Sequence, residues 1–352
     1  MKSLIFTLDY ELYGNGSGNV FTHMIEPTRA ILDVADKYNV KLTFFFEVVE
    51  YWKLKNEWEK GNYMGYTENP IIAIEQQLIY AHSKGHDIQL HLHPQWIDAK
   101  WKNSQWIVNY DKWRLGCYEG EGEDSILAII KRGKETIENI IGKGYQCTAI
   151  RAGGYNAQPS NRIVAAMKEC GLKADSSIVP GAKEAGSLSR YDYSHIKSNI
   201  GFWYCTNNLE NVANGETDII ELPIVAFPII RIQKYLSIER LKSLLQNQKS
   251  AQEAFKAKIN TQAASKINRL VSKFKFFFET EFQTWDYCLF SKGMHRKFLN
   301  GIYKQNHRNV YVLVGHPKSF VSSKGFEFIL QQTQNKYQFI TISSFLDHAK
   351  NS

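Results

Sequence analysis

The chain has 352 residues, and its 43% share of apolar residues excludes an intrinsically disordered protein. Eight prolines are too few for a collagen-like or proline-rich architecture, and the five cysteines include no CxxC pair, which argues against a disulfide framework or a zinc knuckle. The sequence shows no run of 18 apolar residues and no signal-type leader, so we expect a cytoplasmic protein.

The formal net charge of +8 is concentrated in one segment. Residues 231–275 hold eleven Lys or Arg and two acids, whereas the rest of the chain is close to neutral. No nucleic-acid-binding motif accompanies this segment, so we expect no nucleic-acid partner. Two interpretations stay open: a solvated helical insertion, and a surface that contacts an anionic membrane or a lipid-linked glycan and makes the protein membrane-peripheral.

The predicted elements alternate between strands and helices along the chain. Apolar and β-branched runs predict strands at 2–8, 41–49, 87–92, 147–150, 173–176, 218–226, 309–314 and 338–342. Helical spacing with Pro or Gly at the ends predicts helices at 27–38, 70–84, 123–141, 160–170 and 343–350. This repeated order, with few hairpin signals, predicts a mostly parallel sheet, and seven or eight strands favour a barrel in one domain over residues 1–352.

Two insertions interrupt this order. Residues 94–122 form a loop rich in tryptophan, and residues 231–308 contain the basic segment and are expected to be helical. The loop carries Trp96, Trp101, Trp106 and Trp113. Indole rings can stack on sugar rings, so Trp96 is a candidate substrate-binding residue, and anchoring of the loop is an equal alternative.

Polar residues follow the predicted strands, at the carboxyl ends where barrels place their reactive groups. They are Asp9, Glu11, Glu47, His91, His93, Arg151, Tyr155, Asp175, Glu221 and His316. The spacing i, i+2 puts the two carboxylates of the first strand on one side, and likewise the two histidines of the third. One carboxylate with two imidazoles is typical of a catalytic zinc site, and a second carboxylate beside it can act as general base.

Five segments of the sequence, in this order, resemble the motifs of polysaccharide deacetylases, the NodB-homology superfamily of carbohydrate esterases. They are Thr7–Glu11 (TLDYE), Gly85–Pro94 (GHDIQLHLHP), Arg151–Tyr155 (RAGGY), Asp175–Ser177 (DSS) and Gly315–Pro317 (GHP). The resemblance implies a distorted (β/α)7 barrel and a divalent metal, often zinc. It also implies hydrolysis of an acetyl group on an amino sugar or glycan.

The resemblance assigns roles to single residues. Asp9 takes the place of the general base, Arg151 that of the arginine orienting this base, and His316 that of the general acid. Glu11, His91 and His93 are then the metal ligands. The candidate substrate-binding residues are Tyr155, Asp175, Glu221 and Trp96.

The chain departs from the pattern of this superfamily at three positions. Tyr10 stands where a second aspartate is usual, and Gly154 stands where a proline is usual. Gln95 stands four residues after His91, where the second histidine ligand is usual, so we predict that His93 replaces it. These departures indicate a divergent branch.

Two other functions remain open at this point. A glycoside hydrolase that used Glu11 and Glu221 as its carboxylate pair would need no metal, and it leaves the paired histidines unexplained. A binding protein of the deacetylase fold, without metal because Gln95 replaces the usual histidine, would hold a glycan without turnover.

Overall fold

A curled sheet of parallel strands forms the centre of the structure, a computed structural model that describes residues 2–235, 241–242 and 278–349. Within these residues, seven parallel strands follow the spatial order β11–β7–β6–β3–β2–β1–β14. Their bounds are β1 Lys2–Tyr10, β2 Thr43–Glu47, β3 Asp87–Leu92, β6 Ala149–Ala152, β7 Ala174–Asp175, β11 Ile220–Glu221 and β14 Val310–Gly315. A parallel bridge between Ile224 and Val312 joins the two edges, so the expected distorted (β/α)7 barrel is confirmed.

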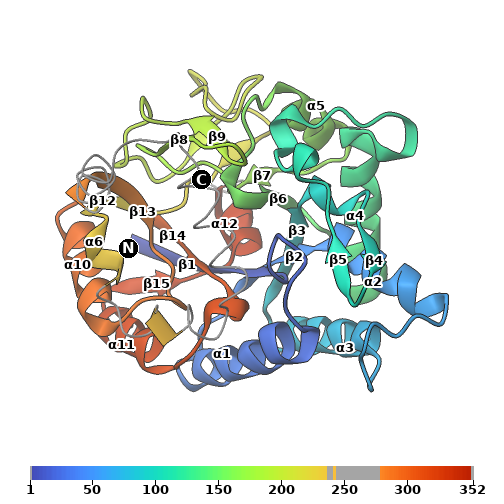
Figure 1. Ribbon diagram of the computed structural model, residues 1–352. Coiled ribbons are helices and arrows are strands. Elements are labelled where there is room, and N and C mark those ends of the chain that lie inside the picture. Colours follow the sequence, from blue (N-terminus) through green and yellow to red (C-terminus); the bar gives the residue numbers. More distant parts are fainter. Residues whose placement is uncertain (1, 236–240, 243–277, 350–352) are drawn as a thin grey trace, which may run out of the picture.

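Helices surround this barrel on the outside, except the last one, α12, which packs against the inward-facing residues (Figure 1). They are α1 Glu26–Lys37, α2 Val48–Glu59, α3 Pro70–Ser83, α4 Ile126–Ile141, α5 Asn161–Glu169, α6 Ile232–Tyr235, α10 Lys292–Tyr303, α11 Lys324–Thr333 and α12 Ile342–Ala349. Side-chain caps fix several of their starts: Asn69 accepts hydrogen bonds from the first turn of α3, and Ser125 does so for α4. None of the helices in the described residues is long and apolar enough to cross a membrane.

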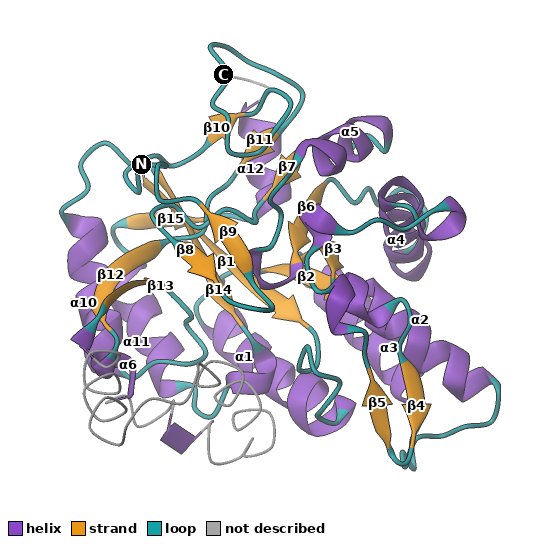
Figure 2. Ribbon diagram, turned by 45° about the horizontal axis from the view of Figure 1, so that its top comes forward, coloured by secondary structure: helices purple, strands orange, loops and turns teal. Residues whose placement is uncertain are grey.

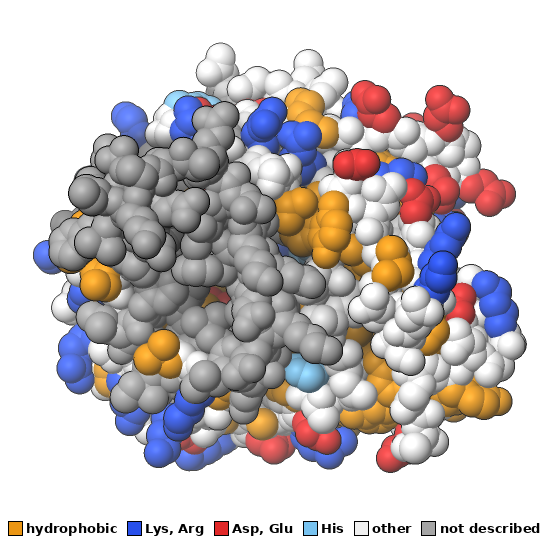
Figure 3. Space-filling model, in the orientation of Figure 1, with side chains coloured by type: hydrophobic (Ala, Val, Ile, Leu, Met, Phe, Trp, Pro, Cys, Tyr) orange, Lys and Arg blue, Asp and Glu red, His pale blue; other side chains and the backbone are white. Residues whose placement is uncertain are grey.

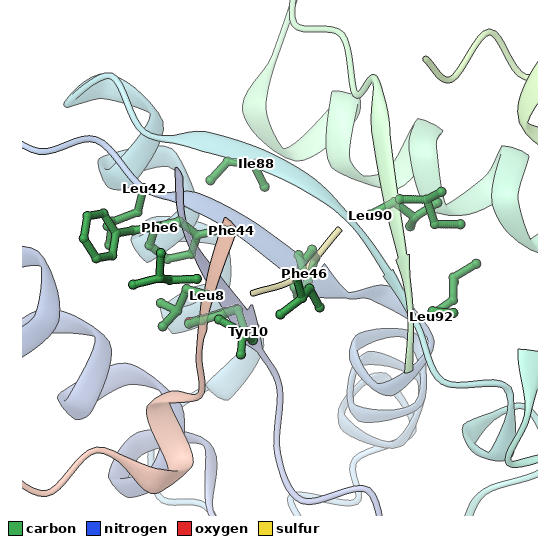
Figure 4. Packing of buried hydrophobic residues seen from close by; sticks show 14 of the residues in the cluster. Phe6, Leu8, Tyr10, Leu42, Phe44, Phe46, Ile88, Leu90 and Leu92 are labelled. Carbon is green, nitrogen blue, oxygen red and sulfur yellow. The ribbon is translucent and has the colours of Figure 1, made fainter. Parts of the chain in front are cut away.

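Alternation along the strands separates two hydrophobic layers. Phe6, Leu8 and Tyr10 of β1 point outward with the matching residues of β2 and β3, and they pack beneath the helices (Figure 4). Ile5 and Phe45 have the opposite parity and point into the barrel, where α12 closes one end. The outward-facing residues of the strands anchor the helices, and the inward-facing residues are available for a functional site.

The structure contains antiparallel strand pairs that the sequence did not indicate (Figure 2). They are β4 Lys100–Lys102 with β5 Gln105–Ile107, β8 Lys183–Ala185 with β9 Arg190–Asp192, and β12 Ala226–Ile230 with β13 Thr280–Thr284. Two further strands extend the main sheet, β10 Trp203–Tyr204 beside β11 and β15 Tyr337–Phe339 beside β1. All of these strands have two to five residues, and the antiparallel ones are too short for the alternating pattern that identifies a strand in sequence. β15 overlaps the strand predicted at 338–342.

The insertion at residues 231–308 is only partly helical in its described residues. β13 lies within it, pairs with β12, and therefore corrects the expectation of a purely helical segment. Most of the basic segment, residues 236–240 and 243–275, lies outside the described residues, and with it most of the surface expected to contact a membrane, residues 231–275. Basic and acidic side chains of the described residues both occur at several places on the face shown in Figure 3.

The predicted end of the second strand, residues 41–49, is wrong, because β2 ends at Glu47. Val48 and Val49 begin α2 instead of continuing β2. The carboxylate of Glu47 accepts hydrogen bonds from the backbone N–H groups of Val49 and Glu50, so a side-chain cap overrides the β preference of the two valines.

Candidate active site

The inward face of the barrel changes from apolar to polar toward the carboxyl ends of the strands. On β1 the inward residues are Ile5, Thr7 and Asp9, and Glu11 follows. The same parity places Glu47, His91, Arg151 and His316 at the ends of β2, β3, β6 and β14. Because parallel strands present their carboxyl ends at one rim, these side chains meet in one buried group.

Asp9 and Arg151 form a buried ion pair. Arg151 Nη1 lies 2.5 Å from Asp9 Oδ1, and both side chains are almost fully buried. The guanidinium also donates to the hydroxyl of Thr7 and to the carbonyl and hydroxyl oxygens of Ser176. Burial alone would raise the pKa of Asp9, but Arg151, with smaller effects of His91 and His316, holds it well below its ordinary value. Asp9 is therefore ionised at neutral pH in one fixed orientation.

His316 lies between two carboxylates. Its Nδ1 is 2.7 Å from Asp286 Oδ2, and its Nε2 is 3.5 Å from Asp9 Oδ2. Burial alone would lower the pKa of His316, but Asp286 and Asp9 raise it to about 10. With 20% of its side chain exposed, His316 is a protonated imidazolium at the open side of the site.

Four ligand atoms beside this ion-pair chain are arranged as a metal site requires. One atom each from Glu11, Glu47, His91 and His93 lies within 4.8 Å of all the others. Glu11 Oε2 is 2.8 Å from His93 Nε2 and 3.5 Å from His91 Nε2. All four residues are buried.

The buried atoms of this group fit a divalent cation. Glu47 Oε2 is buried without a hydrogen-bond partner among the described residues, and the buried His91 Nε2 and His93 Nε2 face Glu11 Oε2 at 3.5 and 2.8 Å. His91 Nδ1 donates to the carbonyl oxygen of Arg151, which leaves the lone pair of Nε2 free to bind a metal. A buried polar atom without a partner is costly, and a cation bound between these atoms would satisfy Glu47 Oε2.

Charges around the group also favour a cation. Burial raises the pKa of Glu47 well above its ordinary value, and Glu11 and Glu50 raise it further. The pKa of Glu50 rises to about 8 through burial and Glu11. Burial would also raise the pKa of Glu11, but the ammonium of Lys318, 2.6 Å from its Oε1, lowers it well below its ordinary value. Three crowded carboxylates share one lysine, so a cation would relieve their repulsion.

Gln95 contacts the histidine that we predicted as the second imidazole ligand. Its Nε2 lies 2.9 Å from His93 Nδ1, and its Oε1 is buried without a partner. An amide in this orientation donates to Nδ1 and places the ring proton on Nε2. A turned amide accepts from an N–H at Nδ1 and frees Nε2 for a cation. In the orientation of the structure the proton therefore lies on His93 Nε2, 2.8 Å from Glu11 Oε2, and a cation at Nε2 requires the turned amide.

A second group of ligand atoms, from Asp9, Glu11 and His316, lies within the same distance limit. It suits a metal less well, because Asp9 is paired with Arg151 and His316 carries a proton that a metal would have to displace.

The predicted substrate-binding residues divide into two sets. Tyr155, with a left-handed φ of 64°, adjoins the site, where burial and the charge of Asp9 raise the pKa of its phenol. Asp175 and Glu221 are fully buried, and their pKa values rise through burial and, for Glu221, through Asp175. These two carboxyls interact with each other inside the barrel and are not exposed to a substrate.

The expectation that Trp96 stacks on a sugar needs correction. Its side chain is 1% exposed, and its ring packs edge-on against Trp106 at a centroid distance of 5.4 Å. A ring that is covered on all sides anchors the loop and has no face for a ligand.

Sequence reasoning missed three contributors to the site. Asp286 comes from the insertion, Lys318 follows two residues after His316, and Glu47 was recognised at a strand end without a role. No local pattern identifies Asp286 or Lys318. Glu47 shares the inward parity of Asp9 and His91, and this signal was available in the sequence.

A separate cavity of about 280 Å³ lies between α2 and α4. Trp52, Lys53 and Arg132 are among its lining residues, and none of the predicted site residues lines it. Arg132 covers the ring of Trp52 at 3.8 Å.

Comparison with known proteins shows similarity at the level of the fold. No family model and no curated protein sequence matches the chain. A GH57 branching enzyme from Thermococcus kodakaraensis has a TM-score of 0.50 at 12% identity, over 98% of this chain and 71% of that one. A putative polysaccharide deacetylase from Mycobacterium smegmatis has a TM-score of 0.48 at 13% identity, over 99% and 90%. The polysaccharide deacetylase Bc1974 from Bacillus cereus has a TM-score of 0.41 at 11% identity, over 97% and 92%.

Polysaccharide deacetylases are thus among the solved structures that the chain resembles, as the sequence motifs led us to expect. At these identities the similarity concerns the barrel fold alone, and the reaction has to be argued from the site.

Proposed function

We propose that this protein is a metal-dependent hydrolase that removes an acetyl group from an amino sugar or glycan. The observation that carries the proposal is the juxtaposition of two units at one rim. One is the ion-pair chain Arg151–Asp9–His316–Asp286, and the other is the buried group of ligand atoms on Glu11, Glu47, His91 and His93. Acyl hydrolysis requires a base, an acid and an electrophile together, and these two units supply them.

A cation would be held by Glu11, His91 and His93, with Glu47 as a fourth ligand. A set of imidazole and carboxylate ligands suits zinc. When bound, such a cation supplies Lewis acidity, which polarises the acyl carbonyl and makes water more acidic.

Asp9 acts as the proton acceptor. Because Arg151 keeps it ionised and oriented, Asp9 can take a proton from the attacking water while the resulting hydroxide adds to the acyl carbon. Four of the five N–H donors of Arg151 are engaged by Asp9, Thr7 and Ser176, and its side chain is fully buried, so it does not face a substrate anion. Its proposed role is to position the base.

His316 acts as the proton donor. It is protonated at neutral pH, partly exposed, and held by Asp286. As the carbon–nitrogen or carbon–oxygen bond breaks, His316 gives its proton to the departing amine or alcohol of the sugar. The products are acetic acid and the free amino sugar or alcohol, and the proton on Asp9 returns to the neutral His316, so the atoms and charges balance.

The test is acetate release from a panel of N- and O-acetylated saccharides by purified protein. Asp9→Asn keeps the shape of the side chain and is expected to lower the rate by at least about a hundredfold, the scale of one general base. Asp36→Asn, at an exposed position on α1, is the matched control and should keep the full rate. Equal rates in both variants would show that Asp9 is not the base.

The same assay separates the two alternatives. A glycoside hydrolase would release reducing ends without metal, but Glu221 is fully buried and interacts with Asp175, which does not favour a pair with Glu11 at a substrate. A binding protein without turnover would bind saccharides and release neither acetate nor reducing ends.

A further inference from the structure

Trp113 lies against the candidate metal group, although it comes from the insertion at residues 94–122. Its ring is 6.0 Å from that of His93, in an edge-on arrangement. On the other side it covers the backbone of Gly14, where an added Cβ would come within 2.7 Å of the indole. Trp113 therefore forms a wall of the site between the segments that follow β1 and β3.

The indole N–H of Trp113 has no partner. Trp113 Nε1 is buried without a hydrogen-bond partner among the described residues. It faces Gly154, since an added Cβ there would lie 3.6 Å from Trp113 Nε1, 3.9 Å from Ser189 Oγ and 3.0 Å from Asn156 Nδ2. An indole N–H is a donor only, so its unmet requirement is for an acceptor.

The polar groups around Trp113 Nε1 differ in how many of their hydrogen bonds are already made within the protein. Asn156 Nδ2 already donates to the carbonyl oxygen of Gly154 and to Ser189 Oγ. Ser189 Oγ accepts that hydrogen bond, so its own proton is free to point toward a ligand. All three groups are uncharged, which favours a neutral ligand rich in acceptor oxygens.

An aromatic surface continues outward from this point. Trp113 is partly exposed, and the ring of Tyr110, 42% exposed, lies 6.0 Å away at a tilt of 32°. Aromatic faces beside hydrogen-bond donors suit sugar rings, which combine apolar C–H faces with hydroxyl oxygens.

We propose that Trp113 and Ser189 form a saccharide subsite in which Trp113 Nε1 and Ser189 Oγ donate to oxygens of a neutral sugar residue. This sugar adjoins the one whose acetyl group is removed, so the inference rests on the proposed function and extends it to the binding of an oligosaccharide. Trp113 takes the role that the sequence suggested for Trp96.

Binding, measured apart from turnover, tests the subsite. Short neutral oligosaccharides, N-acetylated, O-acetylated and unacetylated, are titrated calorimetrically against the Asp9→Asn protein. Adding Trp113→Phe removes the N–H and keeps an aromatic ring, and we expect Kd to rise about two- to tenfold, the scale of one hydrogen bond. Adding Ser189→Ala instead should have a similar effect.

Trp101→Phe is the matched control, because Trp101 lies on the same insertion and packs on Trp106. It should leave Kd unchanged. In nitrogen-15 spectra, the indole N–H signal of Trp113 is the one that is absent from Trp113→Phe. This signal should shift in the parent protein when the oligosaccharide is added.

The possible failures are distinguishable. No oligosaccharide binding by the parent, unchanged Kd in Trp113→Phe, or an equal loss in Trp101→Phe would each overturn the subsite. If the wild-type chain releases acetate while Trp113→Phe leaves Kd unchanged, the proposed function is kept and the subsite is rejected. Binding that depends on Trp113 without any acetate release by the wild-type chain would reject the proposed reaction and keep the subsite.

Discussion

Replacing Arg151 by methionine should destabilise the protein strongly. The guanidinium is fully buried, makes four hydrogen bonds, and is the partner of a buried carboxylate at 2.5 Å. Removing one member of a buried ion pair leaves the other charge without compensation, at a cost of about 3–5 kcal/mol in the free energy of unfolding. Lys37→Met breaks an exposed pair with Glu327 and should cost no more than about 1 kcal/mol.

The coupling between Arg151 and Asp9 can be measured in a double-mutant cycle. Asp9→Asn alone leaves the guanidinium unpaired, whereas the double variant leaves no buried charge of this pair. The double variant should therefore lose less free energy of unfolding than the two single variants together, by between about 1 and 3 kcal/mol. Urea denaturation of the four proteins, extrapolated to water, measures this difference. Additive costs, or an Arg151→Met cost as small as that of Lys37→Met, would refute the reasoning.

The same pair predicts a dependence of stability on pH. The pKa of Asp9 is held below the value of about 3.9 that it has in an unfolded chain. Its contribution to stability is thus complete above that pH and is lost as the pH falls toward the lowered pKa. Arg151→Met should flatten this acid limb of the unfolding free energy.

Three further predictions concern single residues. Asp286→Asn removes a carboxylate that raises the pKa of His316 to about 10, so the alkaline limb of the acetate-release profile should move to lower pH; an unmoved limb contradicts this pairing. Glu47→Gln keeps an oxygen to cap α2 and loses a ligand, so metal affinity in a competition titration should fall at least about tenfold with unchanged helix content. Equal affinity would remove Glu47 from the ligand group. Trp96→Ala should cost about 3–5 kcal/mol in unfolding free energy, and Trp96→Phe should leave saccharide affinity unchanged; weaker binding with full stability would reinstate this ring as a ligand contact.

Much of the barrel and its rim was predictable because strand parity is a local property. The predicted strand at 87–92 coincides with β3, and the i, i+2 spacing placed His91 and His93 on the side that the structure shows facing inward. The rule that barrels collect polar groups at the carboxyl ends of their strands then brought Asp9, Arg151 and His316 to one place.

The rest depended on tertiary contacts. Asp286 reaches His316 because backbone hydrogen bonds of Trp285 and Tyr287 attach this irregular segment to Val225 and Val314, and no local pattern encodes those contacts. From the tryptophan-rich loop the sequence led us to Trp96 as the candidate, although its ring is buried in the loop and the ring of Trp113 lies beside His93. Burial of a single ring follows from packing, which composition does not contain.

Acetate release by one protein sample, measured together with its metal content, tests the central claim most directly. The sample is assayed as purified, after removal of metal by a chelator, and after reloading with one zinc ion per chain. The account predicts that release is lost with the metal and returns with it, and that Glu11→Gln neither retains the ion nor recovers the rate. A metal-free protein that releases acetate at the full rate would contradict it.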